Sequence, residues 1–153
     1  MNTYILSGAT IASLWLGCAV AEVVQLGEDY ERPCKNFVSL LVDDKELWSR
    51  SLDELRKLEN VVNFTEGQQK GKQGIPLAYL LLAADDVQAV EISTCTGKLR
   101  RFDARELAKK QDSLYFIITS YRGLKLHNAL GGEKKKKGAR LKHIDRIRLI
   151  TRP

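Results

Sequence analysis

Runs of apolar residues, some alternating with polar ones, predict short strands along most of the chain. Residues 37–42 (FVSLLV) form one such run, and residues 45–49 continue as a hairpin partner beyond the turn at Asp43 and Asp44. Residues 113–120 (SLYFIITS) form the most strongly apolar run after the first 21 residues. Since a strand buried on both faces is apolar throughout, this run predicts a central strand of a sheet.

Further strands are expected on both sides of this central run. Residues 60–66 predict a strand, and residues 87–95 predict another, joined through a turn at Thr96 and Gly97 to an antiparallel partner at 98–102. Residues 141–150 predict the closing strand. Its expected core positions are Leu141, Ile144, Ile147 and Leu149.

Two helix starts carry capping signals. Ser51 with Glu54 three residues later forms a capping box at the start of SLDELRKL, and Asp103 with Glu106 repeats this spacing before ARELAKK. In each case the polar side chain satisfies backbone amides that have no partner within the helix. The sequence therefore predicts short helices between the strands.

A third helix is expected at residues 75–85, opened by Pro76, after a flexible Gly/Gln/Lys loop at residues 67–74. The chain has 153 residues, of which 44% are hydrophobic and 29% are charged, as in an ordinary globular domain. Together the elements predict an α+β fold with a mixed, twisted β-sheet and short helices.

The N-terminus has the pattern of a secretory signal peptide. Residues 1–21 contain no charged side chain, are apolar from 5 to 20, and end in Ala19-Val20-Ala21, which matches a cleavage site. The positively charged start of most signal peptides is absent. We expect residues 1–21 to be a signal peptide, 22–36 an N-terminal extension and 37–153 the folded domain. The alternatives are a retained membrane anchor and, with weaker support, a lipoprotein acylated at Cys18.

Export would place the remaining cysteines where they can form a disulfide. Removal of the signal leaves Cys34 and Cys95, in a compartment where disulfides persist. The two are either bridged or unrelated buried thiols, and the sequence leaves both open. There is no CxxC motif, and His127 and His143 are the only histidines, so no metal site is predicted.

The charge is concentrated in the second half of the chain. Residues 98–153 hold 17 Lys and Arg against 5 Asp and Glu, or +12, while residues 22–97 hold 8 against 14, or −6, which together give the net +6. Such asymmetry attracts an anion or an acidic protein partner. Export argues against nucleic acid. The four lysines at 134–137 lie between glycines without apolar neighbours, and we expect them to form a solvated loop.

In their order, these segments resemble the sulfite oxidase type of molybdopterin-binding domain. The resemblance is to its small exported single-domain members, covers about residues 37–150, and is most specific in two motifs. These are G-x-P-L at Gly74 to Leu77 and the pattern RLKHI at 140–144. It implies a molybdopterin-binding-like α+β fold with molybdopterin or a related pterin as the cofactor.

The resemblance also implies site residues. In the family's enzymes, one cysteine thiolate on the segment before G-x-P-L binds molybdenum, but residues 60–73 contain no cysteine here, and Cys95 lies after the helix. No catalytic residue is therefore assigned. The family holds the pterin phosphate with basic groups of its final segment, which matches Arg140 and Lys142. Arg122, next to Gly123, is a third candidate.

The leading hypothesis is an exported, non-catalytic binding or redox-accessory module for an anionic small molecule or a protein partner. The first alternative is a protein that binds polyanions or a membrane surface through the lysines at 134–137. The second is an intact molybdopterin-dependent oxidoreductase. Membrane attachment is expected only through a retained signal segment.

Overall fold

Nine strands form one sheet in the computed structural model, which describes residues 34, 36–120, 123–130 and 141–151. The strands are β1 Phe37–Val42, β2 Lys45–Ser51, β3 Val62–Asn63, β4 Gln73–Pro76, β5 Ala89–Thr94, β6 Leu99–Asp103, β7 Leu114–Thr119, β8 Gly123–Asn128 and β9 Lys142–Ile150. Short helices connect some of them: α2 Leu52–Leu55, α3 Leu77–Leu81, α4 Ala104–Lys110 and the 3-10 helix η1 Gly67–Gln69. The coarse α+β class expected from the sequence is the class observed.

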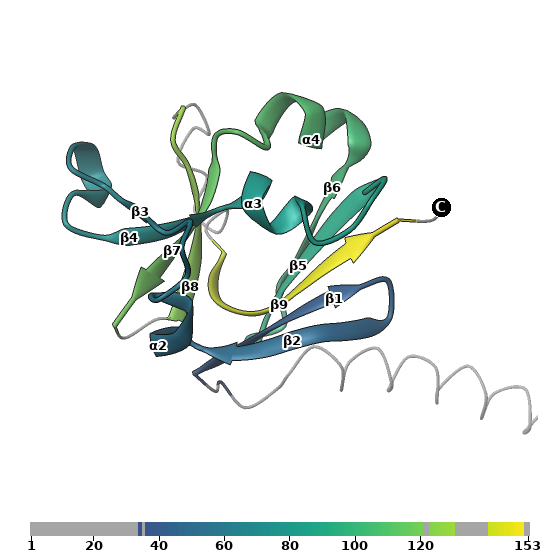
Figure 1. The fold of residues 1–153 in the computed structure, drawn as a ribbon, viewed down its shortest axis with the longest axis horizontal. Coiled ribbons are helices and arrows are strands. Elements are labelled where there is room, and N and C mark those ends of the chain that lie inside the picture. Colours follow the sequence, from purple (N-terminus) through teal and green to yellow (C-terminus); the bar gives the residue numbers. More distant parts are fainter. Residues whose placement is uncertain (1–33, 35, 121–122, 131–140, 152–153) are drawn as a thin grey trace, which may run out of the picture.

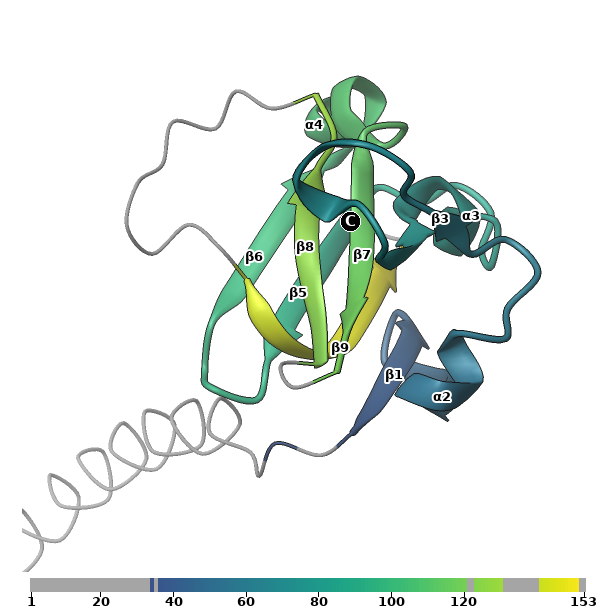
Figure 2. The same ribbon diagram turned by 90° about the vertical axis from the view of Figure 1, so that its left-hand side faces the viewer.

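Strand β9 organises the sheet. The strand order is β2-β1-β9-β8-β7-β4-β3, and β5 also pairs with β9 and carries β6. β1 runs parallel to β9, whereas β5 and β8 run antiparallel to it. Because three strands pair with β9, the sheet curls around the core instead of lying flat. Figures 1 and 2 show this curl, with α4 and α2 towards opposite ends of the molecule.

The core lies inside the curl. Its largest fully buried side chains are Leu40, Leu55, Ile75, Leu77, Ile92, Phe102, Leu114, Phe116, Ile117, Leu124, Ile147 and Leu149. Burying one such side chain stabilises the fold by roughly 1.5–3 kcal/mol relative to its exposure. All four core positions predicted for the closing strand are buried, at 5% exposure or less, so this prediction is confirmed.

Both predicted helix caps are present. The amide of Glu54 donates to Ser51 Oγ (3.2 Å) and the amide of Ser51 donates to Glu54 Oε2 (2.7 Å), which completes the capping box. The amide of Glu106 donates to Asp103 Oδ1 (2.8 Å) at the start of α4. The first helix is shorter than expected, since α2 ends at Leu55.

The segment around Pro76 differs from its prediction. Ile75 and Pro76 were expected to open a helix, but they end β4, and α3 begins at Leu77 with Pro76 as its N-cap. The reason is tertiary: Ile75 pairs with Phe116 of β7 and is buried in the core. The predicted flexible loop is also partly ordered, because it contains η1, whose Gln69 is buried, and the first half of β4.

Strand β9 contains a β-bulge at His143. Leu124 of β8 pairs with Ile144 and Lys125 pairs with Lys142, so His143 is an extra residue on β9. His143 has a φ of 59°, in the left-handed region. The bulge allows Leu141 and Ile144, which are three residues apart, both to be buried in the core. After the bulge, β9 pairs with β1 from Arg146 onward.

Candidate functional site

Two lysines face each other where β8 meets β9. Lys125 and Lys142 are directly paired, and both side chains are half-buried. Directly opposite residues of antiparallel strands project to the same face, with Cβ atoms roughly 5 Å apart. Like charges at this spacing repel each other, and an anion placed between them is attracted to both.

An aromatic group lies next to this pair. His127 follows Lys125 by two residues on β8, so it lies on the same face of the sheet, and it is paired with Tyr115 of β7. The ring of Phe64 packs edge-on against both, with ring centroids 5.3 Å from Tyr115 and 6.1 Å from His127. The basic pair and these rings therefore form one continuous surface.

Gly74 makes room for the Phe64 ring. A Cβ atom at Gly74 would lie 2.7 Å from Phe64 Cε2 and 3.0 Å from Ile117 Cδ1. The first distance is shorter than nonbonded carbon atoms tolerate. The structure therefore explains the glycine of the G-x-P-L motif in this chain: the absence of a side chain at Gly74 lets the Phe64 ring cross β4 and contact Tyr115.

Lys72 extends the basic group from the segment before β4. Its Nζ donates to Oε1 of the buried Gln69 at 3.2 Å. Burial holds the pKa of His127 below its usual 6.5, and the positive charges of Lys125 and Lys72 lower it further. His127 is therefore neutral at neutral pH, and its neighbours carry the positive charge.

We name this surface the basic-aromatic face. It consists of Phe64, Lys72, Tyr115, Lys125, His127 and Lys142. Among the predicted ligand residues, Lys142 lies on it, whereas Arg140 and Arg122 lie outside the described residues. The lysines at 134–137 also lie outside them. Sequence reasoning missed Lys125 and His127. The signal that could have found them is the alternation of apolar and polar residues in GLKLHN, which places both side chains on one face of a strand.

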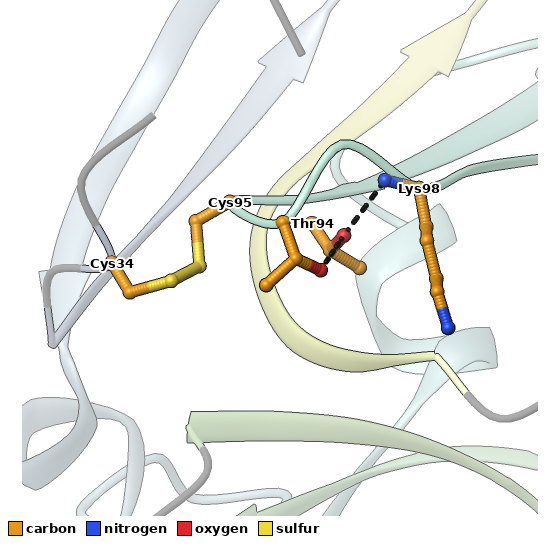
Figure 3. The surroundings of a disulfide bond; sticks show 5 residues. Cys34, Thr94, Cys95 and Lys98 are labelled. Atoms are coloured by element: carbon orange, nitrogen blue, oxygen red, sulfur yellow. Dashed lines mark hydrogen bonds between the residues drawn. A yellow bond between two sulfur atoms is a disulfide. The ribbon is translucent and has the colours of Figure 1, made fainter. Parts of the chain in front are cut away.

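The disulfide is the second chemical feature of the described residues. Cys34 and Cys95 are bridged, with Cα atoms 5.2 Å apart, so the structure decides between the two alternatives that the sequence left open. The bridge connects Cys34, which precedes β1, to Cys95 in the turn after β5 (Figure 3). The Cys95 sulfur is thereby engaged and is not free to replace the thiolate that the molybdenum enzymes use.

A pocket of about 340 Å³ lies between α3 and α4. It is lined by Leu81, Ala84, Asp86, Val87, Ala104, Leu107, Ala108 and Gln111. This lining includes one carboxylate and no basic side chain. It therefore offers nothing to hold an anion, and the basic-aromatic face remains the candidate site.

Comparison with family models, curated proteins and solved structures gave no match to this chain. The described residues form a sheet-rich α+β domain with the Cys34–Cys95 disulfide and a basic-aromatic face over β7, β8 and β9. Among the helices of the described residues, none has the length and apolar character needed to cross a membrane.

Proposed function

We propose that this protein is a non-catalytic binding module for an anionic small molecule that carries an aromatic ring. The observation that carries the proposal is the Lys125–Lys142 pair beside the Phe64, Tyr115 and His127 rings. Lysine ammonium groups attract a phosphate or carboxylate. The neighbouring rings provide an apolar and polarisable wall for a flat ligand.

A pterin phosphate is the ligand that we propose within this class. It combines a flat heterocycle with a charged tail, and it follows from the resemblance to the sulfite oxidase type of fold, which we retain as part of the proposal. Arg140 and Arg122 stay in it as sequence-based candidates for the phosphate contact. The lack of cysteine in residues 60–73, together with the bridged Cys95, supports a role without molybdenum catalysis.

Export belongs to the same proposal. The Ala19-Val20-Ala21 pattern supports removal of a signal peptide, with a mature chain that begins at Glu22. The Cys34–Cys95 bridge is in keeping with an oxidising compartment. The mass of the exported chain tests this part, because a start well before Glu22 would contradict it.

Calorimetric titration with a stable pterin phosphate and with inorganic phosphate tests the site. The double variant Lys125→Ala/Lys142→Ala removes both central charges and should weaken binding on the order of 100-fold, since each charged contact contributes roughly 1.5 kcal/mol and each 1.4 kcal/mol is tenfold. Lys57→Ala/Lys109→Ala removes two exposed lysines outside the basic-aromatic face and should bind as the wild type does.

A third variant distinguishes the proposed site from the alternative, in which the lysines at 134–137 bind a polyanion. Serine at positions 134–137 should leave pterin phosphate affinity within about twofold and should change stability by no more than about 0.5 kcal/mol. If this variant loses binding while Lys125→Ala/Lys142→Ala keeps it, the site is wrong and the polyanion function replaces it. Stoichiometric molybdenum in protein purified from its native compartment would instead favour the oxidoreductase.

A further inference from the structure

His143 lies beside the Cys34–Cys95 disulfide. One ligand atom from each of the three residues, the two sulfurs and an imidazole nitrogen, lies within 4.8 Å of the others. Cys34 is exposed, His143 is half-buried, and Cys95 is only 3% exposed. Sequence reasoning does not group these three residues, because the cysteines are 61 positions apart and Cys95 and His143 are 48 positions apart.

The backbone holds two of these residues in place. The amide of Cys95 donates to the carbonyl of His143 at 3.1 Å, which ties the end of β5 to the bulge of β9. The turn after Cys95 is closed by hydrogen bonds between Thr94 and Lys98, at 2.9 Å from the Thr94 amide and 3.0 Å to Thr94 Oγ1. Figure 3 shows this turn next to the disulfide, with β9 passing beside it as the yellow ribbon.

The bulge brings the His143 residue to this position. In a regular strand, its insertion would shift every later side chain of β9 to the other face. Here the left-handed backbone at His143 absorbs the extra residue. A residue in this conformation that is not glycine is uncommon and often marks a functional position.

We propose that reduction of the disulfide converts Cys34, Cys95 and His143 into a binding site for a thiophilic metal ion, for which Zn²⁺ is the probe. A dithiol reductant gives two electrons and two protons, so the S–S bond breaks, two thiols form, and the reductant becomes a disulfide. Zn²⁺ then displaces both thiol protons and binds two thiolates and one neutral imidazole. Metal and disulfide exclude each other.

The chemistry of this donor set favours such an ion. Thiolate and imidazole are the ligands that Zn²⁺ takes in proteins, and three protein ligands with water as the fourth form an open tetrahedral site. Zn–S bonds of about 2.3 Å place tetrahedral ligand atoms roughly 3.5–4 Å apart. The imidazole nitrogen of His143 lies within 4.8 Å of both sulfurs, so metal binding requires the two sulfurs to separate and the imidazole to come slightly closer. The inference does not rest on the proposed anion-binding function.

Anaerobic titration of the reduced, desalted protein with Zn²⁺ tests the site. Wild type should bind one ion per chain, and the oxidised protein should bind none in the same buffer. His143→Asn removes the imidazole but keeps a residue that tolerates a positive φ, and it should weaken binding at least about tenfold. Cys95→Ser should abolish tight binding. Glu59→Gln, which removes an exposed carboxylate outside the cluster, should bind as wild type does.

Two controls keep the result interpretable. The oxidised His143→Asn variant should melt within a few degrees of wild type, which shows that the bulge tolerates the change. Co²⁺ in place of Zn²⁺ should give thiolate-to-cobalt charge-transfer absorption that His143→Asn alters. Equal binding by oxidised and reduced protein, or by His143→Asn and wild type, would overturn the proposal. So would a reduced chain that is unfolded and does not refold with Zn²⁺.

Discussion

His127 shows how the surroundings of one side chain set its charge. Its ring lies against Phe64 and is partly buried, and the nearby Lys125 and Lys72 are positive. Burial and both charges disfavour the imidazolium form, so the pKa of His127 lies below 6.5 in the folded protein. A neutral imidazole donates one hydrogen bond and accepts another, whereas a protonated His127 would add a fourth cation to the three lysines of the basic-aromatic face.

The pKa shift of His127 predicts a pH dependence of stability. Well above pH 6.5, the side chain is neutral in both the folded and the unfolded chain, and its titration contributes nothing to stability. As the pH falls through 6.5, the unfolded chain takes up the proton before the folded chain does, so the free energy of unfolding decreases. Urea denaturation at pH 7.5 and at pH 5.5 measures this decrease, which should be smaller in His127→Asn. An equal decrease in the variant would contradict the assignment.

At the scale of elements, the segment from β3 to β4 folds back over the sheet. Phe64 follows β3, its amide donates to the carbonyl of Lys72 (3.0 Å), and the amide of Gly71 donates to the Phe64 carbonyl (2.8 Å). These bonds hold the Phe64 ring above β4 and β7. The ring lies against Gly74 of β4, where a Cβ atom would come within 2.7 Å of it. One side of the basic-aromatic face therefore depends on this glycine.

Replacing Gly74 with alanine tests this packing. The added methyl group overlaps the Phe64 ring, and we expect a loss of about 1–3 kcal/mol in the free energy of unfolding, as for other overpacked sites. Phe64→Leu/Gly74→Ala should lose less than the sum of the two single variants, because the smaller side chain relieves the overlap. Chemical denaturation of all four proteins gives the coupling. Strict additivity would show that the ring and the methyl group do not meet.

At the scale of the whole molecule, the Cys34–Cys95 bridge joins two parts of the sheet. Cys34 lies just before β1, Cys95 follows β5, and both strands pair with β9 on its opposite edges. The bridge therefore crosses from one edge of β9 to the other. This position ties the start of the described domain to the strand that organises its sheet.

Removal of the bridge should lower the stability of the fold. A cross-link that spans 61 residues stabilises a domain by about 4 kcal/mol when it acts through the entropy of the unfolded chain. Cys34→Ser/Cys95→Ser should lose about 2–4 kcal/mol relative to the oxidised wild type, measured by urea denaturation without metal. The same variant should be insensitive to reductant, unlike the wild type. A change below about 0.5 kcal/mol would mean that the bridge does not constrain the unfolded chain.

Much of the fold was predictable because its signals are local. The caps at Ser51 and Asp103 depend on side chains three residues apart, and the predicted core positions of β9 are all buried. Prediction failed where a distant partner decided the conformation. Ile75 and Pro76 were expected to open a helix, but pairing with β7 draws residues 73–76 into β4. Likewise, only Val62 and Asn63 of the predicted strand at 60–66 are paired as strand residues with β4.

Most of the strands, the two capped helix starts, the uneven charge and Lys142 as a basic strand residue were predictable from the sequence, because each follows from neighbours along the chain, whereas β4 and β8 were not predicted. The three-dimensional fold was needed to show that Lys125 faces Lys142, that Phe64 packs on Tyr115 and His127, and that Cys34 is bonded to Cys95. These contacts join residues 17 to 63 positions apart, and strand register sets them. The one-residue bulge at His143 toward β8 and the register shift at Asp145 toward β5 set that register in β9, and no local sequence pattern predicts them.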